Sequence, residues 1–221
     1  DEAHCVVEWG DTYRPAYLAA AHVVRTLFPS TPFSLVTATA PNAVVDRMLQ
    51  VMGTTRTAKG VQVLASTQTD RPNLSYALVP KPVLPPSASA KEERSVVLDA
   101  IAALIRGVPR SSSTGGVSAI IVYVLTTAEA ENVSAKLAER LGPSGDKVVK
   151  YHGRMSATDR KRAYESWMSG EARVVVCTTA FGLGVNNLDV RLVVHLNPPP
   201  DLVTYIQQVG RAGRDGLPAE C

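Results

Sequence analysis

The chain has 221 residues, of which 45% are hydrophobic and 19% charged, and its mean hydropathy is +0.03. This composition excludes a disordered tail, which would be less apolar and more charged, and it predicts one large or two small folded domains. The formal charge of +3 excludes a uniformly basic nucleic-acid binder, so any contact with nucleic acid must come from a few placed residues.

The hydrophobic pattern predicts helices that alternate with short strands. In chain order it predicts a helix over 15–28, a strand over 33–36, a helix over 41–52, strands over 61–65 and 74–79, a helix over 91–106, a strand over 117–125, a helix over 128–141, a strand over 147–151, a helix over 157–168, strands over 173–177 and 190–195, and a last helix near 202–209. Apolar strands alternating with longer helices predict an α/β fold, with a parallel sheet covered by helices on both faces.

Two stretches interrupt this pattern. Residues 80–92 hold four prolines within seven positions, and residues 109–116 are rich in serine and glycine. Proline, serine and glycine at this density disfavour regular structure. We expect both stretches to be flexible loops.

The cysteines and the apolar runs indicate in which cellular compartment the protein resides. Cys5, Cys177 and Cys221 are far apart and form no CxxC pair, which argues against a disulfide framework and a zinc site. No apolar run is long enough to cross a bilayer, and no signal-peptide pattern opens the chain. We therefore expect an intracellular protein without a membrane partner, in the nucleus of a eukaryote or otherwise in the cytoplasm.

Acidic residues open the chain as Asp1-Glu2-Ala3-His4. At the end of a strand, such a pair can hold Mg²⁺ through Asp1 while Glu2 orients or deprotonates a water molecule. The alternative is an exposed acidic segment without a chemical role.

The sequence Thr37-Ala38-Thr39 follows the predicted strand 33–36, at the edge where parallel sheets bind ligands. Its hydroxyl groups can simply satisfy loop backbone. If His4 instead bridges a hydrolysis site to Thr37 and Thr39, these residues would report the state of a nucleotide.

Two aromatic residues and an arginine lie between these segments, at Trp9, Tyr13 and Arg14. Aromatic rings in loops often fill the edge of a core. This spacing also suits stacking on unpaired bases, with Arg14 on a phosphate.

The run from Gln207 to Gly216 carries Arg211 and Arg214, which are three residues apart and so share one helical face or turn. The glycines around them let the backbone approach a partner closely. Such guanidinium groups suit the γ-phosphate of a nucleotide, as arginine fingers do. A solvated basic turn is the alternative.

Eight motifs together resemble the RecQ-like DNA helicases, a branch of the superfamily 2 helicases. They are DEAHC, WGDTYRP, TATA, DRPNL, YHGRM, TTAFGLGVNN, VRLVVH and QQVGRAGRDGLPAEC, and they follow the family's order and spacing. The resemblance implies the C-terminal part of a first RecA-like domain over 1–70 and a second RecA-like domain over 71–221. It also implies ATP and Mg²⁺ as cofactors, single-stranded and duplex DNA as partners, 3′–5′ translocation, and a role in DNA repair and recombination.

The resemblance assigns roles to residues in the first seventy positions. Asp1 would hold Mg²⁺, Glu2 would act on the attacking water, and His4 would couple them to Thr37 and Thr39. The aromatic-rich loop that senses single-stranded DNA would comprise Trp9, Tyr13 and Arg14.

Further roles follow for the rest of the chain. The DNA backbone would be contacted by Thr178, Thr179 and Gly182. The nucleotide would be bound by Asp1, Glu2, Gly184, Asn186, Arg211 and Arg214. Catalysis would involve Gln207 and both arginines, with Arg214 as the arginine finger, and His152 would be structural or lie near DNA.

Several positions depart from the family pattern. Asp11 replaces the loop histidine, Asn187 a lysine, Gln208 the glutamate of motif VI, Thr127 an arginine and Thr69 a phenylalanine. No GxxxxGK[ST] sequence is present to hold nucleotide phosphates, so we expect an internal piece of a longer helicase that is inactive alone. The alternative is a non-catalytic nucleic-acid-binding or regulatory module that keeps the helicase shape.

Overall fold

The computed structural model describes residues 2–8, 15–37, 41–65, 70–81, 83, 85, 87, 89–110, 116–142, 145–182 and 185–221. The chain divides into two compact units, Asp1–Asp70 and Arg71–Cys221. No helix within the described residues is long and apolar enough to cross a bilayer.

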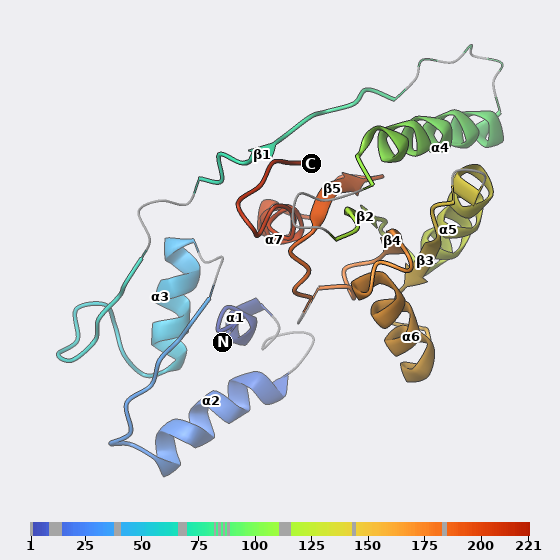
Figure 1. Ribbon diagram of the computed structural model, residues 1–221. Coiled ribbons are helices and arrows are strands. Elements are labelled where there is room, and N and C mark those ends of the chain that lie inside the picture. Colours follow the sequence, from blue (N-terminus) through green and yellow to red (C-terminus); the bar gives the residue numbers. More distant parts are fainter. Residues whose placement is uncertain are drawn as a thin grey trace. The chain divides into compact units, whose positions relative to one another are not determined.

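The described part of the first unit contains three helices: α1 (Cys5–Glu8), α2 (Pro15–Leu27) and α3 (Asn42–Val51) (Figure 1). The short helix α1 contacts both α2 and α3. The ends of α2 and α3 lie within one residue of the helices that the sequence predicts. The sequence pattern does not predict α1, which is only four residues long.

Two predicted strands of this unit are wrong. Residues 33–36 and 61–65 pair with no strand among the described residues. A strand forms only where a neighbour satisfies its backbone N–H and C=O groups. At 33–36 the structure shows one such bond, from the Ala3 N–H to the Val36 carbonyl at 2.9 Å. Val36 is 53% exposed, so this apolar run is not buried as a central strand would be.

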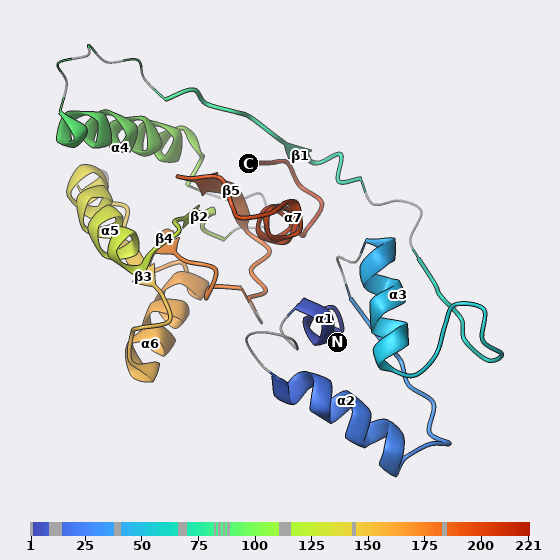
Figure 2. The ribbon, with the colours of Figure 1, turned by 180° about the vertical axis from the view of Figure 1, so that it is seen from behind.

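The second unit is built on a parallel sheet with the strand order β1-β6-β5-β2-β4-β3 (Figures 1 and 2). Its strands are β1 (Leu74–Ser75), β2 (Ala119–Tyr123), β3 (Val148–Tyr151), β4 (Val174–Cys177), β5 (Val190–His195) and β6 (Ala219–Glu220). Its helices are α4 (Ala90–Gly107), α5 (Thr127–Leu141), α6 (Ala157–Met168) and α7 (Leu202–Val209). The predicted α/β fold is confirmed.

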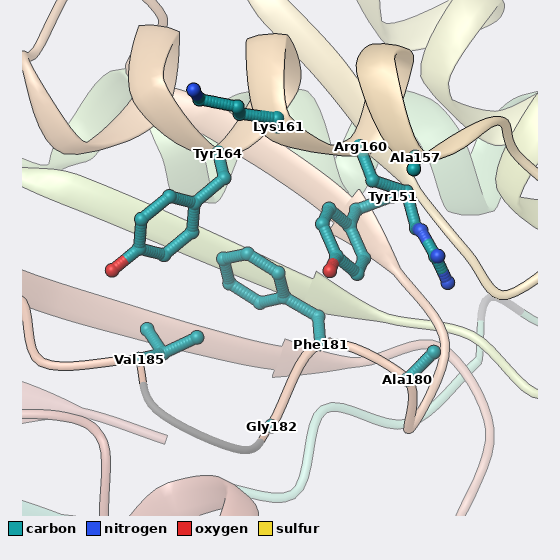
Figure 3. Close-up of a pocket in the computed structure, with 9 residues that line it drawn as sticks. All are labelled: Tyr151, Ala157, Arg160, Lys161, Tyr164, Ala180, Phe181, Gly182 and Val185. Atoms are coloured by element: carbon teal, nitrogen blue, oxygen red, sulfur yellow. The ribbon is translucent and has the colours of Figure 1, made fainter.

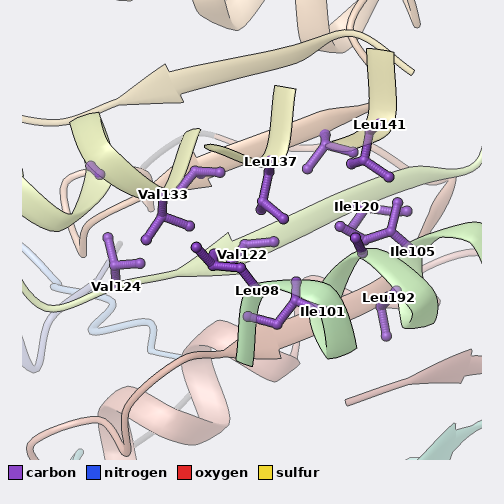
Figure 4. Close-up of a cluster of buried hydrophobic side chains, with 14 residues drawn as sticks. Leu98, Ile101, Ile105, Ile120, Val122, Val124, Val133, Leu137, Leu141 and Leu192 are labelled. Carbon is purple, nitrogen blue, oxygen red and sulfur yellow. The ribbon is translucent and has the colours of Figure 1, made fainter. Parts of the chain in front are cut away.

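Side chains of the central strands alternate between two cores, one on each face of the sheet. On one face, Ile120 and Val122 of β2 pack with Leu137 of α5 and with residues of α4 (Figure 4). On the other face, Ile121 packs in a cluster that includes Trp167 of α6. Because β2 and β4 are buried on both faces, they appear in the sequence as continuous apolar runs.

Capping boxes fix where two of the helices begin. Ser89 Oγ accepts from the Glu92 N–H at 3.3 Å, and the Glu92 carboxylate accepts from the Ser89 N–H at 2.7 Å. Thr126 and Glu129 repeat this arrangement at α5. Each box satisfies backbone N–H groups that the first turn leaves unpaired. The predicted loop 80–92 is therefore wrong at its end, because α4 already begins at Ala90.

The predicted strand 74–79 forms only at Leu74–Ser75. Its partner β6, which the sequence pattern does not predict, pairs through Leu74 with Ala219 and through Ser75 with Glu220. Past this pairing the side chains turn to solvent, and Leu78 is 95% exposed. The apolar pattern therefore extends further than the pairing does.

Candidate functional site

His4 lies at the centre of a small cluster in the first unit. It is 4% exposed, and its Nδ1 atom lies 2.7 Å from Thr37 Oγ1 and 3.5 Å from a Glu2 carboxylate oxygen. Its Nε2 atom faces Cys5 Sγ at 3.7 Å. The structure thus brings together Glu2, His4 and Thr37, three of the residues that the sequence analysis selects.

Six other selected residues lie outside the described ranges: Asp1, Trp9, Tyr13, Arg14, Thr39 and Gly184. Within those ranges, no three His, Cys, Asp or Glu side chains lie close enough together to hold a metal ion.

The second unit brings together residues that follow β4 and α7. The Arg211 guanidinium reaches the loop after β4, where its Nη2 atom lies 3.2 Å from the point that a Cβ would occupy at Gly182. A larger residue at 182 would therefore displace the guanidinium. The Nε atom of Arg211 is buried and has no hydrogen-bond partner among the described residues. A buried donor without an acceptor is costly, which makes Arg211 a candidate donor for a ligand.

Arg214 is held against the same loop. Its Nη1 atom donates to the Val185 carbonyl at 2.8 Å and to Asn186 Oδ1 at 3.1 Å. Burial lowers the pKa of Arg214, and the nearby charges of Arg211 and Arg71 lower it further. Arg71 also donates to the Ala212 and Gly213 carbonyls, so three guanidinium groups belong to or contact this turn. In the part of the chain that the structure describes, neither Arg211 nor Arg214 forms an ion pair with a carboxylate.

Tyr123 connects the two loops from the carboxyl end of β2. It is 3% exposed, and its hydroxyl donates to the Phe181 carbonyl at 3.2 Å. Burial raises the pKa of Tyr123, and the neighbouring Cys177 raises it further, so the phenol is neutral. The Arg211 guanidinium lies close to the same phenol, and its charge opposes this rise in the pKa of Tyr123. Tyr123 therefore supports Arg211 without adding charge.

Sequence reasoning assigned no role to the residues that hold the turn at 211–217, which carries both arginines. Arg71 and Asn73, just before β1, donate to carbonyl groups of this turn. Arg191 of β5 forms a bidentate ion pair with Asp215, with Nη1 at 3.0 Å from Oδ1, and this bond lowers the pKa of Asp215. The signal was present, because these residues belong to the DRPNL, VRLVVH and arginine-rich motifs.

His195 ends β5 beside the last turn of α7. Its Nε2 atom lies 2.8 Å from Gln208 Oε1, and its ring stacks on Tyr123 with centroids 5.3 Å apart. The ring of Tyr205, on α7, also lies next to the His195 ring, with the two centroids 5.2 Å apart. Burial lowers the pKa of His195, so the imidazole is neutral near pH 7. Gln207, the neighbour selected from the sequence, is half-buried in the last turn of α7.

The residues selected for DNA contact differ in exposure. Thr178 is 8% exposed, and its Oγ1 atom accepts from the Ala180 N–H at 3.4 Å. Thr179 is exposed. Thr178 thus supports the turn that presents Thr179 and Gly182.

A pocket of about 480 Å³ opens beside this turn. Figure 3 shows the Phe181 ring between those of Tyr151 and Tyr164, with Arg160 and Lys161 contributed by α6. Tyr151 and Phe181 meet edge to face at 4.9 Å. Aromatic rings with cations at the rim are a combination that binds unpaired bases and phosphates.

His152 directly follows β3 and is far in sequence from the turn at 211–217. It is 4% exposed, and its Nε2 atom lies 3.0 Å from Glu131 Oε1 on α5. Bonds from Lys150 and then His152 lower the pKa of Glu131. His152 thus ties β3 to α5.

Comparison with known proteins connects this geometry to a family. Residues 98–216 match the model of the helicase conserved C-terminal domain. The whole chain is 37% identical to ATP-dependent DNA helicase Q-like 2 of Arabidopsis thaliana, 35% identical to ATP-dependent DNA helicase Q4 of Homo sapiens and 30% identical to ATP-dependent DNA helicase RecQ of Pasteurella multocida. It spans 28%, 17% and 30% of the lengths of these relatives.

Solved helicase structures share the fold. Dbp5 of S. cerevisiae bound to RNA and ADP BeF3 matches 100% of this chain over 50% of its own, with a TM-score of 0.70 and 20% identity. Helicase Lhr of Mycobacterium smegmatis bound to ssDNA and AMP-PNP matches 66% of this chain over 18% of its own, with a TM-score of 0.53 and 25% identity. The predicted RecA-like fold and RecQ-like resemblance are confirmed. The chain therefore belongs to the family of the helicase conserved C-terminal domain, in its RecQ-like branch.

Proposed function

We propose that the chain is part of an ATP-dependent DNA helicase that couples ATP hydrolysis to 3′–5′ translocation and duplex unwinding. The observation that carries this proposal is that Arg71 binds the turn that bears Arg211 and Arg214, while one buried donor of Arg211 has no acceptor among the described residues. The relatives named above are ATP-dependent DNA helicases, which supports the same reading.

Three neighbouring positive charges repel one another, and an anion with several oxygens relieves this repulsion. A planar guanidinium donates two parallel bonds to a phosphate, whereas an ammonium is a point charge. Arg211 and Arg214 thus fit the terminal phosphates of ATP. ATP would supply the phosphoanhydride bond that is hydrolysed. The two arginines would neutralise the negative charge that develops as this bond breaks.

The cluster in the first unit supports a second part of the proposal. We assign Glu2 to the attacking water and His4 to coupling, because His4 contacts both Glu2 and Thr37. A change at Glu2 would thereby reach the segment that begins at Thr37. Mg²⁺ would be held by Asp1, and a carboxylate is the type of ligand that this ion prefers.

DNA would bind on the other side of the loop after β4. The pocket beside Gly182 offers the half-buried rings of Tyr151 and Tyr164 to unpaired bases, and Arg160 and Lys161 to phosphates. Lhr, which has a similar fold, was solved with ssDNA and AMP-PNP together. In a eukaryote, we propose that the protein acts in the nucleus.

The test uses the whole protein that contains this chain. We expect single-stranded DNA to stimulate its ATP hydrolysis, and a duplex with a 3′ tail to be unwound faster than one with a 5′ tail. Arg160→Ala should weaken the stimulation. Arg162→Ala is the matched control, because Arg162 is on the same helix but does not line this pocket.

DNA binding without ATP hydrolysis or unwinding would contradict the proposal and favour the non-catalytic module. We expect the isolated 221-residue chain to hydrolyse ATP poorly, because its sequence has no GxxxxGK[ST] loop and positioning supplies most of phosphoryl-transfer catalysis.

A further inference from the structure

Arg71 and Asn73 bind the turn that carries Arg214 from a segment about 140 residues earlier in the chain. The Nη2 atom of Arg71 donates to the carbonyls of Ala212 at 3.0 Å and Gly213 at 2.7 Å. The Asn73 amide donates to the same Gly213 carbonyl at 2.9 Å and, also at 2.9 Å, to the carbonyl of Leu217.

These bonds order the two side chains relative to each other. Arg71 Nε donates to Asn73 Oδ1 at 3.3 Å, so the amide nitrogen of Asn73 is turned toward the arginine turn. Asn73 thus uses both ends of its amide, and Arg71 uses two of its nitrogens. Together, Arg71 and Asn73 donate hydrogen bonds to main-chain carbonyls on both sides of Arg214.

Gly213 shows how close this contact is. Its φ of +55° is a conformation that side-chain-bearing residues rarely adopt. A Cβ at this position would lie 2.4 Å from the Asn73 amide nitrogen and 2.8 Å from the Leu217 carbonyl oxygen. The absence of a side chain therefore lets Asn73 reach the backbone of the turn.

The turn is also held from β5. The Gly213 N–H donates to the Val190 carbonyl at 3.0 Å, and Asp215 pairs with Arg191. Bonds from β5 on one side and from Arg71 and Asn73 on the other leave the turn little freedom to rotate. The directions of the Arg211 and Arg214 side chains follow from the backbone that is fixed in this way.

We propose that Arg71 and Asn73 are positioning residues for ATP hydrolysis: they hold the 211–217 turn so that Arg211 and Arg214 keep their orientation. The inference rests on the proposed function for the role of Arg211 and Arg214 in ATP hydrolysis. The contacts by which Arg71 and Asn73 hold the turn do not depend on that proposal. Arg71 adds a positive charge next to Arg214, which stability alone disfavours.

The experiment compares Asn73→Leu and Arg71→Lys with Arg173→Lys in the whole protein. Leucine keeps the size of asparagine but removes both donors, and lysine keeps the charge but loses the fork. Arg173 is the matched control, because it also donates to two loop carbonyls, those of Val108 and Pro109, which lie outside the 211–217 turn.

ATPase kinetics and amide hydrogen exchange are measured for each variant. We expect Asn73→Leu and Arg71→Lys to lower kcat about 10- to 100-fold with little change in KM for ATP, because displacing a catalytic group by about 1 Å has effects of this size. Amide exchange should accelerate within 211–217. In Arg173→Lys, exchange should accelerate around 108–118 while kcat stays at the wild-type value.

Two results would overturn the inference: exchange at 211–217 that is unchanged in Asn73→Leu, or a kcat that falls equally in Arg173→Lys. If the wild-type protein does not hydrolyse ATP, the proposed function fails. Exchange still decides the holding role in that case, because acceleration confined to 211–217 supports it and unchanged exchange refutes it.

Discussion

Two groups of arginine side chains organise loops in the second unit, and they differ in whether a carboxylate forms an ion pair with the guanidinium. At the amino end of β4, Arg173 is 4% exposed and its Nη1 atom lies 3.2 Å from Asp146 Oδ1. Arg110 pairs with the same carboxylate at 2.8 Å. In the turn before β6, Arg211 and Arg214 lie beside Arg71, whose Nη2 atom donates to the Ala212 and Gly213 carbonyls.

This difference separates two uses of one side chain. A buried guanidinium that only joins loops is best paired with a carboxylate, because an isolated buried charge is strongly unfavourable. A guanidinium that binds an anion must keep donors available, at some cost to stability. The comparison therefore divides these arginines into a stabilising group, which comprises Arg173 and Arg110, and the group that we propose binds a ligand, the ligand-binding group.

The largest expected effect separates the two groups by catalysis. Arg214→Ala in the whole protein should lower ATP turnover by about 10³- to 10⁵-fold, which is the usual contribution of an arginine finger. KM for ATP should change little, because the interaction strengthens only in the transition state. Steady-state ATPase assays with single-stranded DNA measure both values.

Arg214→Lys tests whether charge alone suffices. We expect no rescue, because an ammonium lacks the planar fork that binds phosphate at two points. Turnover near the wild-type value in either variant would remove Arg214 from the ligand-binding group.

The second effect separates the groups by stability. Asp146→Ala leaves the Arg173 guanidinium buried without its carboxylate, and breaking a buried pair in this way costs about 3–5 kcal/mol. Urea unfolding of the 221-residue chain measures this loss. The control is Asp99→Ala, because Asp99 is 62% exposed in its pair with Arg140, and exposed pairs contribute about 0–1 kcal/mol. Equal losses would contradict the assigned roles.

A third test uses pH at the carboxyl end of β5. Burial lowers the pKa of His195 below its unfolded value of about 6.5. The folded protein therefore binds fewer protons than the unfolded chain, and stability from this residue is lost as pH falls from about 6.5 through the folded pKa.

Gln208→Glu should reverse this dependence, because a carboxylate at 2.8 Å would stabilise the imidazolium and raise the pKa of His195. NMR titration of the imidazole protons measures the pKa in both proteins. An unchanged pKa in the glutamate variant would show that residue 208 does not control His195.

The smallest expected effect concerns how much the ligand-binding group lowers the free energy of unfolding. Arg211→Met removes a buried Nε without an acceptor and one of three crowded charges, while keeping an unbranched stem. We expect the free energy of unfolding to stay within about 0.5 kcal/mol of the wild-type value or to rise. A clear loss in urea unfolding would place Arg211 with Arg173 instead.

The sequence pattern predicts the second unit much better than the first. The ends of α6, β5 and α7 are those predicted, because buried apolar residues alternate there with clear turn residues. In the first unit, apolar residues at 33–36 carry the same signal but lack a paired neighbour among the described residues. Strand pairing is a property of two segments, and one segment alone cannot show it.

The candidate site divides in the same way. The spacing of Arg211 and Arg214 predicts that they share a turn, since residues three apart meet in a helical turn. The contacts of Arg71 and Asn73 with that turn are not predictable from spacing. Their acceptors are main-chain carbonyls, which every residue has, and no side-chain pattern identifies the ones that are used.

The pairing of β1 with β6 has a consequence for synthesis of the protein. The Ser75 hydroxyl donates to the Ala219 carbonyl, 144 residues later in the chain. A ribosome that adds roughly 5–20 residues per second needs about 7–30 s to make the intervening residues. Arg71, Asn73 and the apolar Leu74 must wait that long for their partners. The 211–217 turn is thus among the last parts of this unit to be completed. Until then, a chaperone bound near β1 would keep the unpaired Leu74 segment from aggregating.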